Sequence, residues 1–260
     1  MHTALIDGVE IAFHDEGAGR PLLLVHAFPL NSAMWQRQIA ALAPRYRVIA
    51  PDLRGFGASA RGTGAASLDQ LADDLAGLLD HLGLDLANVA GLSMGGYIIF
   101  ALWRRHRARV ASLILADTRA GADSPEAKQV RANNARLAEE QGPGAIADQM
   151  LPKLLAPGAP QPLRDEVRRI VESNDRAGIA AALRAMAARP DSTPLLATID
   201  VLALVIVGSA DELTPPPEAH ALSAGIAGSR LVEIPGAGHL SNLDNPAAFN
   251  TAVDEFLAAI

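Results

Sequence analysis

The chain has 260 residues, half of them hydrophobic, with 22 basic and 29 acidic side chains and no cysteine. This length can bury one large core, and the lack of cysteine excludes disulfides, thiolate catalysis and cysteine-ligated metal sites. Like charges cluster only in the run from Arg104 to Arg109, which closes an expected helix, so we expect neither nucleic acid nor a membrane as partner.

The first segment of the chain, MHTALIDGVEIAF, lacks the basic and apolar regions of a secretory signal peptide. No later apolar run approaches the roughly 20 residues that span a membrane, so a cytoplasmic location is expected. Residues 3–6 and 10–14 flank Asp7-Gly8, a dipeptide typical of a two-residue hairpin turn. The sequence predicts an antiparallel β-hairpin here.

Short apolar runs then alternate with longer helical segments. The expected strands are 22–25, 48–50, 89–90, 112–116, 202–207 and 231–234, and the expected helices are 33–42, 68–82, 94–105 and 216–224. Near-continuous apolar strands separated by helices are typical of a parallel sheet that is covered on both faces. We therefore predict an α/β fold with a mostly parallel sheet behind the N-terminal hairpin.

The alternation stops between about residues 121 and 190, where Ala, Arg and Pro are frequent. Helical segments are expected at 125–140, 144–155, 162–172 and 177–188, without a convincing strand. A long crossover is the simpler alternative, but one crossover does not require several helices. We predict a helical cap at 121–190, inserted into a core formed by residues 1–120 and 191–260.

The strongest local motif is Gly91-Leu92-Ser93-Met94-Gly95, a G-x-S-x-G sequence between an expected strand and an expected helix. A nucleophile on such a sharp turn needs almost no side chain two residues to either side. A loop serine would have no reason to bear the backbone strain of this turn, about 1–3 kcal/mol. Ser93 is therefore the candidate nucleophile, and the amide of Met94 at the helix start is a candidate donor to an oxyanion.

A serine hydroxyl needs a base to act as a nucleophile at neutral pH. His239 lies in a glycine-rich loop after the last expected strand, at the same carboxyl edge of the sheet as Ser93. It is the candidate base. The other histidines have no comparable context, and no pair has the spacing of helical metal ligands, so we expect no metal site.

A carboxylate should orient this histidine. Asp211 follows the expected strand 202–207 at the same edge, and the chain order of nucleophile, acid and base is then the one expected for this constellation. Asp117, which ends the expected strand 112–116, is the rival acid. Three further acids are expected on a solvated helix face: Asp73, Asp74 and Asp80.

Five segments together resemble the α/β-hydrolase superfamily, and within it the capped branch of serine esterases, lactonases and perhydrolases that includes the 3-oxoadipate enol-lactonases. In chain order they are HAFP at 26–29, PDLRGFGAS at 51–59, GLSMGG at 91–96, GSAD at 208–211 and GH at 238–239. They cover the core on both sides of the expected cap, and their joint occurrence in this order makes the resemblance specific. It implies the α/β-hydrolase fold.

The resemblance also implies that Asp211 is the acid and that the amides of Phe28 and Met94 form the oxyanion hole. His26 is then expected to brace the oxyanion loop and not to act as the base. Ala27 stands where many relatives carry glycine, so its methyl group could narrow the hole. Relatives that open epoxides or dehalogenate alkanes use an aspartate nucleophile, a chemistry that the serine here excludes.

The expected function is hydrolysis of a small ester or lactone through an acyl-enzyme, without a cofactor. Two alternatives are a perhydrolase or cofactor-free haloperoxidase activity, which Pro29 after the oxyanion residue resembles, and a non-catalytic ligand-binding protein, against which the intact triad argues. The candidate substrate contacts are Ala27, Met150, Leu154 and Leu240, and the candidate partners of a substrate carboxylate are Arg119, Arg176 and Arg189. The residues carry no signal for an oligomeric state.

Overall fold

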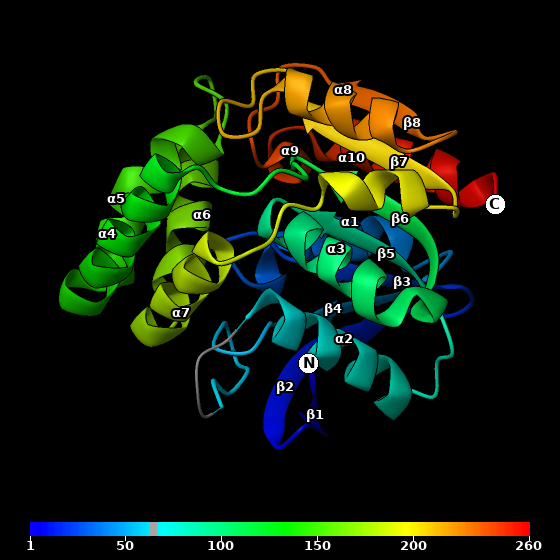
Figure 1. Ribbon diagram of the computed structural model, residues 1–260, viewed down its shortest axis with the longest axis horizontal. Helices are drawn as coiled ribbons and strands as arrows, with labels where there is room; N and C mark the ends of the chain where they lie inside the picture. The colour runs from blue at the N-terminus through cyan, green and yellow to red at the C-terminus, as the bar shows by residue number, and fades with distance from the viewer. Residues whose placement is uncertain (63–66) are drawn as a thin grey trace.

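The computed structural model describes residues 1–62 and 67–260. An eight-stranded sheet with the order β1-β2-β4-β3-β5-β6-β7-β8 forms its centre (Figure 1). The strands are β1 (His2–Ile6), β2 (Val9–Glu16), β3 (Pro21–Val25), β4 (Arg47–Pro51), β5 (Ala87–Leu92), β6 (Val110–Ala116), β7 (Ala203–Gly208) and β8 (Arg230–Ile234). β2 is antiparallel to both β1 and β4, and all other neighbours are parallel. The predicted fold class is confirmed.

Helices cover both faces of the sheet. One face carries α2 (Leu68–His81), α3 (Met94–His106) and α8 (Pro216–Gly225), and the other carries α1 (Gln36–Leu42), α9 (Ser241–Asp244) and α10 (Pro246–Ala258). Alternate strand residues serve the two faces: in β3, Leu23 and Val25 pack on the first face and Leu22 and Leu24 on the second. Both faces of each central strand are therefore buried, which explains its continuous apolar run.

The hairpin was predicted from the sequence, but the last helix was not. Asp7 and Gly8 have φ values of 46° and 74°, as a two-residue turn with left-handed residues requires, and the predicted hairpin is confirmed. The expected helix at 33–42 is divided between the 3₁₀ turn η1 (Ser32–Trp35) and α1. The helix α10 was not predicted, although Asn245 caps it and Pro246 occupies its first turn, both ordinary start signals.

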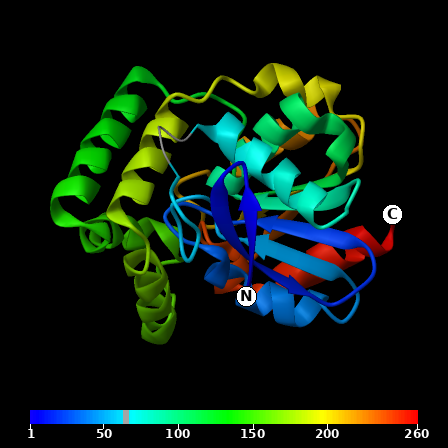
Figure 2. The same cartoon turned by 90° about the horizontal axis from the view of Figure 1, so that it is seen from below.

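Between β6 and β7 the chain folds into α4 (Pro125–Gln141), α5 (Pro143–Leu154), α6 (Gln161–Glu172) and α7 (Arg176–Ala187). We call these helices the helical insertion. Figures 1 and 2 show them to one side of the core, beyond the carboxyl ends of the parallel strands. Each helix lies within one residue of its expected bounds. Two 3₁₀ turns, η2 (Arg107–Arg109) and η3 (Thr193–Thr198), lie in the core on either side of the insertion.

The basic run at the end of α3 forms ion pairs instead of an open patch. Each arginine pairs with an aspartate: Arg104 with Asp69, Arg105 with Asp73, Arg107 with Asp200 and Arg109 with Asp80. This run therefore offers little unpaired charge to a polyanion. None of the helices in the described ranges is both long and apolar enough to cross a bilayer.

Asp74 corrects the sequence analysis, which placed this residue on a solvated helix face. Its side chain is 4% exposed and accepts two hydrogen bonds from Arg54, at 2.6 and 2.5 Å. The Arg54 side chain is itself only 8% exposed. This buried ion pair holds the loop after β4 against α2, and helical periodicity alone could not reveal a partner from another segment.

We predict that Asp74→Ala destabilises the fold by about 3–5 kcal/mol, because it leaves the Arg54 guanidinium buried without a counter-charge. The matched control is Asp80→Ala, which removes the more exposed pair with Arg109 and should cost about 0–1 kcal/mol. Urea unfolding at neutral pH measures both free energies. Equal losses in the two variants would contradict this account of the buried pair.

Candidate active site

Ser93 occupies the turn between β5 and α3, with a φ of 56° and a ψ of −111°. A Cβ on Gly95 would lie 2.3 Å from the carbonyl oxygen of Val25, and a Cβ on Gly91 would lie 2.5 Å from the backbone of Gly95. Any side chain at either position would force the backbone apart, so both positions require glycine. The strained turn holds Ser93 at the carboxyl edge of the sheet, where the sequence analysis expected it.

Ser93, His239 and Asp211 form one line of hydrogen bonds. The His239 Nε2 atom lies 2.8 Å from Ser93 Oγ, and His239 Nδ1 lies 2.8 Å from Asp211 Oδ2. An ionised carboxylate can only accept, so we assign the imidazole proton to Nδ1, which leaves Nε2 to accept from the serine hydroxyl. The structure thus brings together three residues that the sequence analysis selected from three separate loops.

The carboxylate of Asp211 is held by donors from its own turn. Its Oδ1 accepts from the amides of Leu213 and Thr214, at 2.8 and 3.0 Å, and its Oδ2 accepts from the Thr214 hydroxyl at 2.7 Å. Burial alone would raise the pKa of Asp211, but the hydrogen bonds and charge of His239, with the donors of Thr214, bring the pKa below its ordinary value. Asp211 is therefore ionised at neutral pH.

Thr214 was missed by the sequence analysis. Besides its two bonds to Asp211, its hydroxyl oxygen lies 3.2 Å from His239 Nδ1. The available signal was its position three residues after the aspartate, a spacing typical of turns in which an Asp side chain accepts from the backbone ahead of it.

Asp117, the rival acid, is bonded to other partners. Its Oδ1 accepts from the Gly208 amide at 2.7 Å, and its Oδ2 accepts from the Ser241 hydroxyl. It is fully buried, and burial together with the nearby charge of Asp211 raises its pKa well above the ordinary value. Asp117 therefore links two loops of the site, whereas Asp211 holds the imidazole of His239.

The loop after β3 carries His26 and Phe28. His26 is fully buried, its Nε2 accepts from the Leu53 amide at 3.1 Å, and its ring packs edge-on against Phe56 at 5.1 Å, so it braces the loop as expected. Phe28 lines the same cavity as Ser93. Within residues 1–62 and 67–260, neither its amide nor that of Met94 donates to a side chain or a loop carbonyl.

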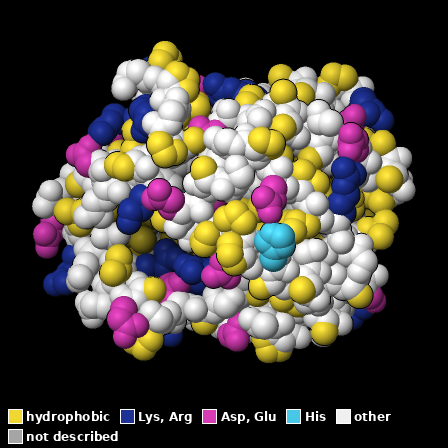
Figure 3. Space-filling model, turned by 90° about the horizontal axis from the view of Figure 1, so that it is seen from above, with side chains coloured by type: hydrophobic (Ala, Val, Ile, Leu, Met, Phe, Trp, Pro, Cys, Tyr) yellow, Lys and Arg dark blue, Asp and Glu magenta, His cyan; other side chains and the backbone are white. Residues whose placement is uncertain are grey.

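Two adjoining cavities lead to Ser93. The inner cavity, of about 100 Å³, is lined by Ser93, His239 and Thr214 among others. The outer cavity, of about 550 Å³, lies between the core and the helical insertion, and Figure 3 shows a hollow there with basic side chains inside it. The two cavities share five lining residues: Phe28, Arg119, Arg131, Met150 and Leu213. Together they form a path from the surface to the serine.

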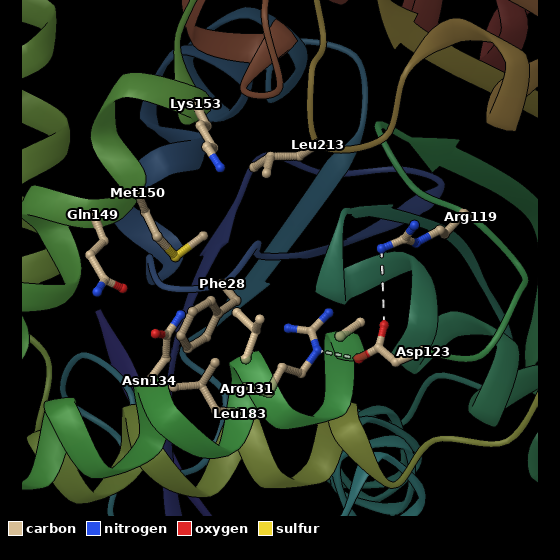
Figure 4. A pocket seen from close by; sticks show the side chains of 12 residues that line it. Phe28, Arg119, Asp123, Arg131, Asn134, Gln149, Met150, Lys153, Leu183 and Leu213 are labelled. Carbon is tan, nitrogen blue, oxygen red and sulfur yellow. Dashed lines mark hydrogen bonds and ion pairs between the residues drawn. The ribbon is translucent and has the colours of Figure 1, made fainter. Parts of the chain in front are cut away.

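Positive charge predominates in the outer cavity, whose charged lining residues are Arg119, Arg131, Lys153 and one carboxylate, Asp123 (Figure 4). The Arg131 Nε atom donates to Asp123, which also lies 2.8 Å from Arg189 Nη1. Burial alone would raise the pKa of Asp123, but its arginine partners bring the pKa below the ordinary value. Asp123 is therefore a permanent counter-charge for Arg131 and Arg189.

Arg119 is less firmly paired than its neighbours. Its nearest carboxylate oxygens belong to Glu218 and Asp123, at 3.8 and 4.0 Å, which is beyond hydrogen-bonding distance. Of the three arginines that the sequence analysis offered to a substrate carboxylate, Arg119 lines both cavities. Arg189 is instead buried beneath the Tyr97 ring at 4.1 Å, and Arg176 donates to a backbone carbonyl at the surface.

The predicted substrate contacts fare unevenly. Met150 lines both cavities. Ala27, Leu154 and Leu240 are not among the residues that line either cavity; each has 0% exposure and packs in the core. The Ala27 amide donates to Met34 Sδ at 3.2 Å, away from the serine. The apolar character of these residues predicts that they are shielded from water. It does not predict whether the core or a substrate shields them.

The comparisons with known proteins agree with this architecture. Residues 20–151 match the family model of the alpha/beta hydrolase fold. The 3-oxoadipate enol-lactonase 2 of Acinetobacter baylyi is 36% identical over 91% of this chain and 88% of its own length. A non-heme haloperoxidase of Rhodococcus erythropolis is 30% identical over 90% of each chain. A thermophilic esterase from Thermogutta terrifontis is 43% identical with a TM-score of 0.97, covering 100% of this chain and 99% of that one. The chain belongs to the α/β-hydrolase family.

Proposed function

We propose that this protein hydrolyses carboxylic esters or lactones through an acyl-enzyme formed on Ser93. The observation that carries the proposal is the line of hydrogen bonds from Ser93 through His239 to Asp211, at the inner end of a cavity open to substrate. The similarity to an esterase and to an enol-lactonase supports the same reaction class. A protein that only binds a ligand has no need to keep a strained serine against an imidazole.

In this mechanism Ser93 Oγ attacks the carbonyl carbon while His239 Nε2 takes the serine proton, and Asp211 stabilises the imidazolium that forms. The carbonyl oxygen becomes an oxyanion, to which the amides of Phe28 and Met94 donate. As the bond to the leaving alkoxide breaks, His239 gives it the proton, and Ser93 is left acylated. Water deprotonated by His239 then attacks the acyl carbon and releases the acid.

Hydrogen peroxide could replace water in the last step and yield a peracid, which is the second candidate reaction. The similarity to a non-heme haloperoxidase is the observation that favours it. Both reactions pass through the same acyl-enzyme, so the residues assigned above serve either one. The acyl acceptor alone separates them.

A panel of 4-nitrophenyl esters and lactones tests the proposal. Ser93→Ala should lower kcat by more than about 10³-fold, and Asp211→Asn by about 10³–10⁴-fold, because the histidine loses its productive tautomer. Asp117→Asn is the matched control and should stay within about tenfold of wild type, because Asp117 does not hold the imidazole. Hydrogen peroxide is added at the same concentration to each assay, and the products are analysed for acid and peracid. Their ratio identifies the acyl acceptor.

Retention of a tenth or more of the activity by correctly folded Ser93→Ala would refute the acyl-enzyme. A larger loss in Asp117→Asn than in Asp211→Asn would exchange the roles of the two aspartates. Acid as the dominant product in the presence of peroxide supports hydrolysis, and peracid as the dominant product supports the second reaction.

The raised pKa of Asp117 gives a test by pH. The unfolded chain releases this proton near pH 3.9, while the folded protein still holds it, so stability should fall with rising pH above that value by up to about 1.4 kcal/mol per unit. Asp117→Asn removes this dependence. The variant should therefore gain stability relative to wild type between about pH 4 and 7 in urea unfolding. A stability difference that does not change with pH would show that Asp117 ionises normally.

We also propose that the preferred substrate carries a negative charge at some distance from its scissile bond. Arg119 has no carboxylate within hydrogen-bonding distance, and its buried Nε lacks a partner among the described residues. Lys153 lines the outer cavity and points into it in Figure 4. A substrate carboxylate would give these two cations the charged hydrogen-bond partner that residues 1–62 and 67–260 do not supply.

The charge proposal predicts a change of specificity in Arg119→Gln. The ratio of KM for 4-nitrophenyl hemisuccinate to KM for neutral 4-nitrophenyl butyrate should rise about tenfold, the effect of losing roughly 1.4 kcal/mol from one charged hydrogen bond. The matched control is Arg176→Gln, at the surface of the insertion, which should leave the ratio unchanged. An unchanged ratio in Arg119→Gln would contradict the proposal.

A further inference from the structure

The end of α5 is bonded to the backbone on both sides of His239. After the histidine, the Leu240 amide donates to the carbonyl of Leu154 at 2.8 Å. Before it, the amide of Gly238 donates to Asp244 Oδ2 at 2.8 Å, and the same oxygen accepts from the Ala156 amide at 2.8 Å. The loop that carries the proposed base therefore has two connections to the helical insertion.

This junction is tightly packed. A Cβ on Gly238 would lie 2.6 Å from the Ala156 nitrogen and 2.7 Å from the Leu155 carbonyl carbon, so only glycine allows the two segments to approach this closely. Leu154 and Leu240 are fully buried beside it. Two segments held this closely can shift only together, because packed interiors do not yield by small continuous deformation.

Arg164 braces the insertion side of the junction. Its guanidinium donates to the carbonyls of Ala156, Pro157 and Ala159, at 3.2, 2.9 and 3.1 Å. The chain that leaves α5 is therefore bonded to α6 as well as to Asp244. This makes the end of α5 a firm attachment and not a loose hinge.

The same helix lines the outer cavity. Gln149, Met150 and Lys153 of α5 face it, and Met150 also lines the inner cavity (Figure 4). Lys153 directly precedes Leu154, which accepts the hydrogen bond from the His239 loop. A substrate that presses against α5 therefore presses on a helix bonded to the loop of the base.

We propose that Asp244 is a positioning residue, which with α5 couples occupancy of the outer cavity to the placement of His239. The inference rests on the proposed role of His239 as base. Asp244 touches neither substrate nor reacting atoms; it acts by fixing the Gly238 amide, and through it the imidazole, whose 2.8 Å contact with Ser93 must be kept. A misplacement of about 1 Å in such a contact can cost around 10²-fold in rate.

Replacement of Asp244 tests the positioning role. Asp244→Ala removes the shared acceptor and should lower kcat for 4-nitrophenyl acetate by about ten- to a hundredfold with KM changed less than about twofold. Asp244→Asn can place its single carbonyl oxygen at the position of Oδ2 and should recover most of the kcat. Full kcat in Asp244→Ala, or equal losses in the alanine and asparagine variants, would overturn the proposal.

A double-mutant cycle tests the coupling itself. Met150→Ala alters the face of α5 that lines the cavity. The kcat of the double variant with Asp244→Ala should therefore differ by at least about threefold from the value obtained by multiplying the two single effects. Leu183 lines the same cavity from α7 and is the matched control. Its alanine variant should combine multiplicatively with Asp244→Ala. Multiplicative effects in both cycles would overturn the coupling.

Gly238→Ala tests the junction if Asp244→Ala does not fold. The added methyl group displaces the Ala156 segment without removing a polar group, and the same selective loss of kcat is expected; an unchanged kcat would overturn the proposal. These experiments can refute the positioning role without refuting the proposed function, and the reverse. Loss of activity in Ser93→Ala with full kcat in Asp244→Ala refutes only the positioning role, whereas retained activity in Ser93→Ala refutes the proposed function.

Discussion

The close approach of α3 to the end of β3 determines the geometry of the whole site. Gly95 lies so near the Val25 carbonyl that no side chain fits between them. This contact holds Ser93, the proposed nucleophile, in its strained conformation at the edge of the sheet, with the start of α3 next to it. The loop of Phe28 begins directly after Val25, and a Cβ on Gly95 would also lie 3.2 Å from the His26 carbonyl oxygen of this loop. One packing constraint thus positions the proposed nucleophile together with both proposed oxyanion donors.

The parallel sheet brings the other groups to the same edge, and the helical insertion is bonded to both sides of the site. On one side, Asn174 Nδ2 donates to the Pro29 carbonyl at 2.9 Å, next to Phe28 of the proposed oxyanion loop. On the other side, the Leu154 carbonyl accepts from the amide of Leu240, next to the proposed base. The insertion therefore does more than line the outer cavity. Its helices form the walls of the cavity and share hydrogen bonds with the loops in which the chemistry would occur.

Local signals predicted the strands, the hairpin and the three residues of the hydrogen-bonded line, because each signal combines a sequence motif with its place at a strand end. The remaining features depend on contacts between distant segments. Leu154 and Met150 are both apolar and lie on one helix, yet only the docking of α5 decides that Met150 faces the cavity and Leu154 the core. Asp74 likewise has the sequence context of a surface acid, and only the fold brings Arg54 to it.

Covalent labelling of the nucleophile tests the central claim most directly. A fluorophosphonate reacts with an activated serine by forming an oxygen–phosphorus bond and releasing fluoride, and intact-mass analysis with peptide mapping locates the adduct. The account predicts one adduct per chain, on Ser93, with labelling slowed by about 10²–10⁴-fold in His239→Gln because the general base is lost. Labelling at another residue, or labelling of Ser93 at the wild-type rate in His239→Gln, would contradict it.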